Sequence, residues 1–205
     1  MRKNINGGNA MKKLIERFLT IMVICLIMML VVSSIALAED NIYKIGYLLA
    51  SDASVTKSGS ESKPRMGPSF AFSIERALEI NEDFEMGFGT GLLLSGEFED
   101  SDDKIMCVPI YLLLNYYPLS IEGLPYLTGH FGYNFLSYDD GNSTNLHGLY
   151  YAIGAGIRIV KYPSIRAEVL YRANNGSGTE DSYWGSGQEV KASLSRISLN
   201  LGLGF

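Results

Sequence analysis

Residues 197–205, with the sequence ISLNLGLGF, decide the fold of the chain, because every second residue is large and apolar. The residues between them are Ser, Asn and Gly. Successive side chains of a β-strand point to opposite faces, so this alternation places hydrocarbon on one face only. The segment therefore predicts a strand that separates an apolar environment from a polar one.

The same period of two recurs in seven earlier segments. The alternating runs have 6 to 11 residues. With the residues that flank them, the segments are about 9 to 11 residues long, the length a tilted strand needs to cross a bilayer. Two places fit less well. Ile74, Ala77 and Leu78 have helical spacing, so a short helical turn is an alternative there. Pro109 lacks the N–H that a strand ladder requires, and we interpret it as a bulge or rim position. The seven segments are 43–49, 69–74, 84–94, 110–116, 127–135, 149–159 and 166–172.

The connections between these segments alternate in length. With an even number of strands, this alternation places all long loops at one end of the fold and both chain termini at the other. Outer-membrane barrels have this arrangement, with short periplasmic turns and long extracellular loops. The long connections are 51–67, 95–104, 137–148 and 174–192, and the shorter ones are 76–83, 117–125 and 160–164.

The residues on the second face distinguish a lipid-facing barrel from a soluble one. A secreted lipocalin-like barrel, with an apolar ligand inside, would turn its large apolar face inward. Here the other face carries Gly, Ser, Ala, Asn and a few charges, and Gly on a water-facing strand surface would only weaken the strand. Inside a narrow barrel, Gly makes room for larger side chains such as Arg158, Arg166 and Tyr111. We therefore expect the apolar face to contact lipid, with the soluble barrel as the alternative.

Aromatic residues fall at the expected ends of the segments. Transmembrane barrels carry such girdles at the level of the lipid head groups, where amphipathic rings are favoured. The expected periplasmic girdle consists of Tyr43, Phe84, Tyr116, Tyr126, Tyr162 and Phe205, and the candidates for the opposite rim are Phe70, Phe135 and Tyr171.

The first 38 residues have the organisation of a secretory signal peptide. Lys12, Lys13 and Arg17 give a basic start, residues 18–32 are almost wholly apolar, and Ala36-Leu37-Ala38 offers a small-residue cleavage site. An uncleaved helical anchor is the alternative, since residues 18–38 are long enough to span a membrane. We expect residues 1–38 to be the signal peptide, with a possible start at Met11, and residues 39–205 to be one barrel domain.

Composition argues against several other classes of protein. The 205 residues include only two His and two Cys, so they offer no zinc-type cluster. The net charge of −5 argues against nucleic acid as a partner. Cys25 lies in the expected leader, which leaves Cys107 with no intramolecular disulfide partner in the mature chain. We expect neither a metal nor a cofactor.

The chain after residue 38 resembles the small outer-membrane β-barrel family, the OmpA/OmpX-like transmembrane barrels of diderm bacteria. The residues that carry the resemblance are Pro125-Tyr126-Leu127 leading to Gly132-Tyr133, the stretch 167–172, and the final strand ending at Phe205. In that family, the outer-membrane assembly machinery reads the terminal aromatic residue and the alternate apolar residues before it. The resemblance assigns this role to Phe205, Leu203 and Leu201. It also implies a location in the outer membrane, with its lipid and lipopolysaccharide as surroundings.

Seven charged residues lie on the polar face of their segments, between the large apolar residues, and are expected to point into the barrel. Eight strands enclose only enough space for side chains. We therefore expect an internal salt-bridge network that plugs the lumen, with Arg158 next to Glu168 on neighbouring strands. A narrow pore is the alternative. The seven residues are Lys44, Glu75, Glu85, Arg158, Arg166, Glu168 and Arg172.

Two further sets of residues suggest other functions. Some small outer-membrane barrels act on lipid A with a Ser and a His. Here His147 shares the outward parity with Ser193 and Ser195, but a strand lies between them, and His130 has the inward parity. Acidic residues in 97–103 and 139–140 suggest calcium binding, although no complete ligand-spaced loop is present.

The expected function is therefore non-catalytic. We expect a structural, adhesion or surface-interaction role in the outer membrane, exerted through four long extracellular loops. A lipid A-modifying enzyme is the alternative from another class. The sequence does not identify the partner of the loops.

Overall fold

In the computed structural model, the chain forms antiparallel strands in one main sheet. The structure describes residues 40–57, 59–94, 98, 104–118, 125–139, 143–160, 163–180 and 187–205, so the expected signal peptide, residues 1–38, lies outside the described residues. None of the described residues forms a helix long and apolar enough to cross a membrane. The barrel strands are β1 (Asp40–Leu48), β5 (Ser69–Asn81), β6 (Phe84–Leu93), β7 (Lys104–Tyr116), β8 (Pro125–Asp139), β9 (Ser143–Val160), β10 (Ser164–Glu180) and β11 (Gln188–Gly204).

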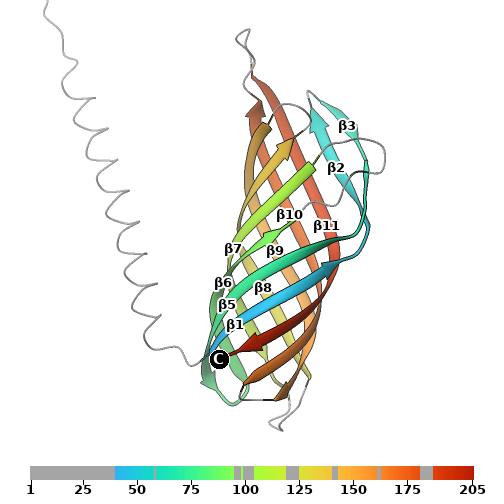
Figure 1. Cartoon of the computed structure of the whole chain (residues 1–205). Coiled ribbons are helices and arrows are strands. Elements are labelled where there is room, and N and C mark those ends of the chain that lie inside the picture. The colour runs from blue at the N-terminus through green and yellow to red at the C-terminus, as the bar shows by residue number, and fades with distance from the viewer. Residues whose placement is uncertain are drawn as a thin grey trace, which may run out of the picture. The chain divides into compact units, whose positions relative to one another are not determined.

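These eight strands close into a ring, as the sequence predicts. Neighbours in the chain are neighbours in the sheet, in the order β1-β5-β6-β7-β8-β9-β10-β11, and pairing of β1 with β11 completes the circle. The closing register places Tyr43 opposite Leu203 and Tyr47 opposite Leu199. Where the eight strands form the ring, every strand is paired on both sides (Figure 1). A β-structure in lipid must be closed in this way, because lipid offers no hydrogen-bond partner to an unpaired strand edge.

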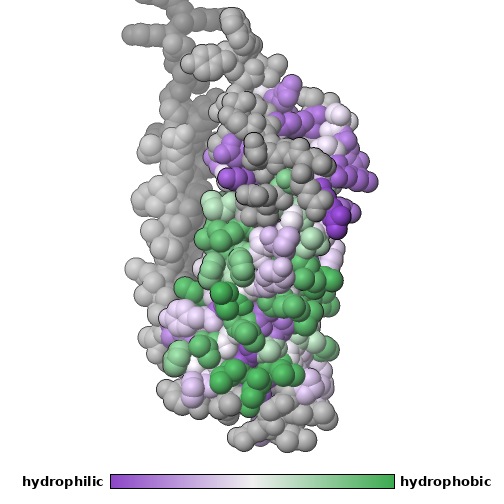
Figure 2. All heavy atoms as spheres, turned by 45° about the vertical axis from the view of Figure 1, so that its right-hand side comes forward, coloured by the Kyte–Doolittle hydropathy of each residue, from purple (hydrophilic) through white to green (hydrophobic). Residues whose placement is uncertain are grey.

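Large apolar side chains cover the outside of the ring, and small or charged ones lie inside. Leu201 and Ile153 are 63% and 66% exposed, whereas Ser198 and Arg166 are fully buried. On the face shown in Figure 2, a band of hydrophobic residues lies below a hydrophilic upper end. An exposed apolar surface of this size and continuity indicates a membrane contact. In this part of the structure the large apolar side chains therefore face outward, whereas in a lipocalin-like barrel they would face inward.

The strands at one end extend further than predicted. Parts of 137–148 and 174–192, expected to be loops, continue as strand in β8, β9, β10 and β11, and the β10–β11 ladder reaches Glu180 and Gln188. The alternation continues there with the opposite chemistry. Leu146 and Leu194 are buried inside, while Asn145 and Lys191 are exposed. The strands predicted from the sequence are those with apolar residues on the outward face, so a segment whose apolar residues face inward is not recognised as a strand.

The expected loop 51–67 is also largely strand. It forms β2 (Ser51–Lys57), β3 (Ser60–Ser62) and β4 (Arg65–Met66), and β2 extends the sheet by pairing with β11 from Val190 to Leu194. Gly59 has a φ of 81° between β2 and β3, a conformation that Gly adopts at little cost. The short alternation in Ala53 and Val55, both buried, is the signal that indicates a strand here.

The two uncertain segments are both strand. β5 is continuous from Ser69 to Asn81, with Ile74 exposed and Ala77 buried on opposite faces, so no helical turn forms. Pro109 lies within β7 opposite Asn134 of β8. On the β6 side the register pairs stop at Thr90–Ile110 and resume at Leu93–Cys107. Pro109 is therefore accommodated by an interruption of one ladder, because it has no N–H to donate.

Candidate functional site in the barrel lumen

The centre of the lumen holds an ion-pair group built from β1, its neighbour β5, and β10, which is separated from β1 by β11. Lys44 of β1 places its Nζ 2.5 Å from Glu75 Oε2 of β5 and 2.5 Å from Glu168 Oε1 of β10. All three side chains are nearly fully buried. Burial of a charge is tolerated only where partners and hydrogen bonds compensate for the lost hydration. One lysine thus links two carboxylates across the barrel.

Aromatic side chains complete this group. The Tyr111 hydroxyl donates to Glu75 Oε1 at 2.8 Å, and the Tyr126 hydroxyl donates to Glu168 Oε1 at 2.5 Å. The His130 ring stacks on Tyr111 with ring centroids 4.5 Å apart. The assignment of Tyr126 to the periplasmic girdle is therefore wrong. Tyr126 is 1% exposed and points inward, because β8 begins at Pro125 and its even-numbered residues face the lumen.

A second ion-pair group surrounds Glu85 of β6. Its carboxylate lies 2.8 Å from Arg166 Nη1 and 2.5 Å from Arg158 Nη1, and it also accepts hydrogen bonds from the Tyr117 hydroxyl at 2.8 Å and from Asn115 Nδ2 at 3.1 Å. The ion pair of Arg158 therefore crosses the lumen. The expected pairing with Glu168 on the adjacent strand is not the one formed, because Arg158 lies opposite Arg166 in the register and Glu168 lies opposite Gly156.

Two arginines in the lumen use neutral partners. Arg172 donates from Nε to Ser198 Oγ at 2.9 Å and from Nη2 to Asn200 Oδ1 at 3.0 Å. Arg196 donates to the Ser69 hydroxyl at 2.8 Å and to the Leu49 carbonyl at 3.1 Å. The sequence reasoning missed Arg196, although its even number gives it the same parity as Ser198. All seven expected lumen charges lie inside the barrel, and Arg158 is the most exposed of them, with 22% of its side chain accessible.

Glycines make this filling possible at particular positions. A Cβ on Gly89 would lie 2.8 Å from the Tyr111 ring, and one on Gly156 would lie 2.5 Å from the Tyr126 ring. Real side chains do not tolerate such distances. The lumen therefore has room for these tyrosines because the neighbouring strands carry Gly, as predicted for Tyr111.

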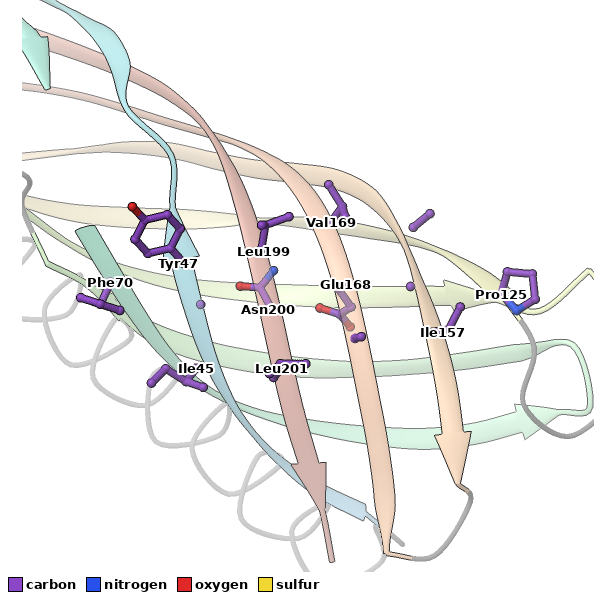
Figure 3. A pocket seen from close by; sticks show the side chains of 14 residues that line it. Ile45, Tyr47, Phe70, Pro125, Ile157, Glu168, Val169, Leu199, Asn200 and Leu201 are labelled. Carbon is purple, nitrogen blue, oxygen red and sulfur yellow. The ribbon is translucent and has the colours of Figure 1, made fainter. Parts of the chain in front are cut away.

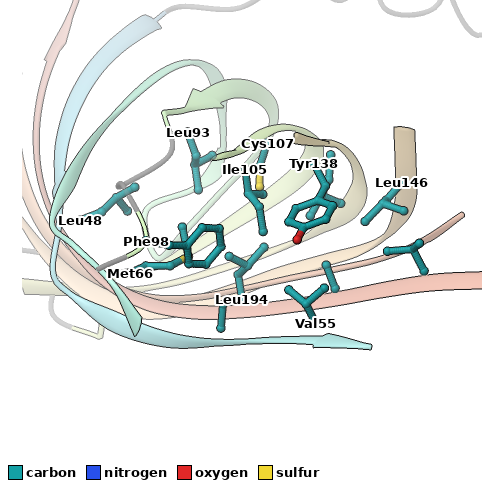
Figure 4. Close-up of a cluster of buried hydrophobic side chains, with 14 of the residues drawn as sticks. Leu48, Val55, Met66, Leu93, Phe98, Ile105, Cys107, Tyr138, Leu146 and Leu194 are labelled. Atoms are coloured by element: carbon teal, nitrogen blue, oxygen red, sulfur yellow. The ribbon is translucent and has the colours of Figure 1, made fainter. Parts of the chain in front are cut away.

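An apolar cluster fills the lumen at its other end, which the sequence reasoning did not anticipate. The side chains of this upper cluster point toward one another from β1, β2, β4, β6, β7, β8, β9 and β11 (Figure 4). On β9, β10 and β11 the exposed residues at this level are polar, such as Asn145, Ser177 and Lys191, so on these strands the chemistry of the two faces is inverted relative to the lipid-facing band. The cluster includes Leu48, Val55, Met66, Leu93, Phe98, Ile105, Cys107, Leu136, Tyr138, Leu146, Val190 and Leu194.

The residues of the enzyme alternative are separated. His147 is exposed and hydrogen-bonds through Nδ1 to the Tyr133 hydroxyl at 2.6 Å. Ser193 lies on β11 and donates to Asn175 Oδ1 of β10 at 2.7 Å, and β10 stands between it and His147. His130 is buried in the lumen. Within the described ranges, no group of three or more His, Cys, Asp or Glu is arranged to hold a metal ion, and most of the acidic loop residues lie outside those ranges.

Phe205 and the other described aromatic residues that were expected in the girdle and the opposite rim, apart from Tyr126, lie on the outer surface. Phe205 is 59% exposed, and its backbone N–H and C=O groups are both close to Asn41, with the Phe205 N–H donating to the Asn41 carbonyl at 3.0 Å. Phe84 stacks on Tyr116 with ring centroids 4.8 Å apart. Tyr162 lies outside the described residues. The other expected girdle and rim residues on the outer surface are Tyr43, Phe70, Phe135 and Tyr171.

A closed ring of eight antiparallel strands, an apolar outer band and a charged, filled lumen define a small transmembrane β-barrel of the outer-membrane type. This is the fold that the sequence resemblance predicts.

Solved structures of similar fold come from several bacteria. Ail, the attachment invasion locus protein of Yersinia pestis, has 18% identity and a TM-score of 0.47 over 82% of this chain and 99% of its own. Neisserial surface protein A has 15% identity and a TM-score of 0.48 over 81% and 97%. The outer membrane protein OprG of Pseudomonas aeruginosa has 15% identity and a TM-score of 0.47 over 82% and 96%. No protein-family model and no curated protein matches the chain.

Proposed function

We propose that the protein is an exported, non-catalytic outer-membrane barrel whose work is structural or is done at its extracellular end. Export depends on the expected signal peptide, residues 1–38. Assembly depends on Phe205, Leu203 and Leu201, which the resemblance assigns to recognition by the assembly machinery. All three side chains are about half exposed or more on the outer surface at the end of β11 and the residue after it, where such a partner would reach them.

The observation that carries the proposal is the filled lumen. The Lys44 and Glu85 groups occupy one part of it, and the upper apolar cluster occupies the other. A hydrated ion would have to break buried ion pairs and then pass the mostly apolar upper cluster, whose side chains replace little of its water. Both steps are costly in a low-dielectric interior. The barrel is therefore a closed scaffold.

The extracellular end suits a role in surface interaction. The upper cluster gives the extended parts of β8–β11 and β2 a core of their own, so these strands form a rigid collar. Exposed polar residues such as Asn145, Ser177, Thr179 and Lys191 cover its outer wall. Lipopolysaccharide head groups are the partner nearest to this wall in an outer membrane. Loops held on a rigid scaffold are a common place for binding specificity.

Single-channel recording in a planar bilayer tests the closed scaffold. The refolded mature chain, residues 39–205, should insert without producing stable open channels. Stable conductance steps at every insertion would support the narrow pore instead. Mass spectrometry of lipopolysaccharide after incubation with the protein tests the enzyme alternative, for which a lost or moved acyl chain is the required result.

A further inference from the structure

A groove with a volume of about 670 Å³ lies on the lipid-facing side of the barrel, outside the lumen. It crosses β1, β11, β10 and β9 (Figure 3). One end is at Phe70, near the start of β5, and the other is at Pro125, the first residue of β8. Because β5 and β8 run in opposite directions, the starts of these two strands lie at opposite ends of the barrel, and the groove connects the two borders of the apolar band.

Two alanines form the floor of this groove. Ala155 of β9 lies opposite Leu127 and Val169, and Ala167 of β10 lies opposite Ile157 and Leu201. The side chains on either side are two to three carbons larger than a methyl group. A hollow in an otherwise convex surface is the direct result of placing two small residues among these larger ones.

The side chains that face the groove are almost entirely hydrocarbon. Glu168 and Asn200 belong to the same strands, but their polar atoms are bound inside the lumen to Lys44 and Arg172. The polar side-chain atom on the outer surface of the groove is the Tyr47 hydroxyl. Tyr47 packs edge-on against Phe70 with ring centroids 5.7 Å apart, at the upper border of the band. The groove thus has a polar group at one end and hydrocarbon along its length.

We propose that the groove is a binding site for one acyl chain of a membrane lipid, whose head group lies at the Tyr47 end. The inference rests on the proposed location in the outer membrane. Within the hydrocarbon layer, an empty hollow would lose the dispersion contacts of all its lining atoms, and water would find no partner along most of it.

A flexible chain fits this site better than another protein does. Lipid tails are as apolar as Leu, so protein association within a membrane relies on close backbone approach and on hydrogen bonds between side chains. The groove offers large side chains at its rim and a single hydroxyl at one end. An acyl chain needs no hydrogen-bond partner and adapts its torsions to an irregular surface.

Native mass spectrometry of the mature barrel tests the proposal. The barrel is purified in non-ionic detergent with palmitoyl-oleoyl phosphatidylethanolamine as the probe, and bound lipid is counted per protein. We expect the unmodified barrel to retain one phospholipid. The double variant Ala155→Leu/Ala167→Leu fills the floor and should retain it several-fold less. Gly129→Leu is the matched control, because it adds the same side chain on the lipid face at a position where the new Cβ meets no atom within 4 Å.

A second measurement needs no substitution. In lipid nanodiscs, magnetisation should pass from acyl-chain protons to the methyl groups of Ala155 and Ala167 at the floor of the groove. Equal lipid retention by the unmodified barrel and the double variant, or absence of transfer to both methyl groups, would overturn the proposal. A dimer that the double variant abolishes would overturn it in favour of a second copy of the chain. None of these outcomes depends on conductance, so failure here is distinct from failure of the closed scaffold.

Discussion

Lys44 and Glu168 are 124 positions apart in the chain, yet their charged atoms lie 2.5 Å apart at the centre of the barrel. Closure of the sheet between β1 and β11 brings them together, with β10 as the next strand. The same lysine holds Glu75 at 2.5 Å on the other side. The Lys44–Glu168 pair therefore forms only when the ring is complete, and the two ion pairs together connect the first strand to strands on both of its sides.

Removal of Glu85 should destabilise the barrel strongly. Glu85→Ala leaves Arg158 and Arg166 without their shared carboxylate in the lumen, and loss of one partner of a buried pair costs about 3–5 kcal/mol. Urea unfolding of the barrel in lipid vesicles, followed by circular dichroism, measures the change. Glu61→Ala is the control, since Glu61 is exposed on β3 and its removal should change the unfolding free energy by less than about 0.5 kcal/mol. Similar losses in both variants would contradict the buried ion-pair group.

The upper apolar cluster should behave like the core of a water-soluble protein. Leu146→Ala removes a fully buried side chain from it and should cost about 2–5 kcal/mol. Leu112→Ala removes a lipid-facing side chain that is 63% exposed, and it should cost much less, because lipid tails replace the lost contacts. The same unfolding titration compares the two. A larger effect at Leu112 would show that the cluster does not stabilise the collar.

Arginine substitutions along β10 should locate the upper border of the lipid band. Val169→Arg places a charge in the apolar band and should cost about 2–4 kcal/mol, whereas Ser177→Arg on the same outer face of the collar should cost about 0–1 kcal/mol. Both positions are exposed in the structure, so neither variant meets a packed interior. Folding titrations into lipid vesicles measure the difference. Equal costs would mean that the band extends over the collar.

Loss of the terminal aromatic residue should impair assembly in cells. Phe205→Ala keeps the strand, whose N–H donates to the Asn41 carbonyl at 3.0 Å, but removes the ring from the outer surface. The amount of heat-modifiable barrel in the outer-membrane fraction should fall, while refolding of the purified chain into vesicles should change little. Unchanged amounts in cells would contradict the assembly role.

The lipid-facing half of the barrel was predictable from sequence because its pattern is strict. Leu199, Leu201 and Leu203 alternate with small or polar residues, and hydrogen-bonded pairing keeps this parity from strand to strand. The collar was not predicted, since Leu146 and Val190 are apolar on the opposite parity and were counted with loops.

The exact ion pairs also lay beyond the sequence. Parity placed Arg158 and Glu168 inside the barrel, but register decided that Arg158 meets Glu85 across the lumen, 73 positions away in the chain. The inward position of Tyr126, in contrast, follows from parity alone, since Tyr126 has the same even parity as His130 and Asn134 on β8.

Methyl NMR of the leucine-labelled mature barrel, in bilayers containing a lipid with a nitroxide on its acyl chain, tests the orientation of the two faces most directly. The methyl signals of Leu112, Leu127, Leu199 and Leu201, which point outward, should be broadened. Those of Leu113, Leu146 and Leu170, which are buried in the barrel, should keep their intensity. Broadening of the second set with protection of the first would contradict the account.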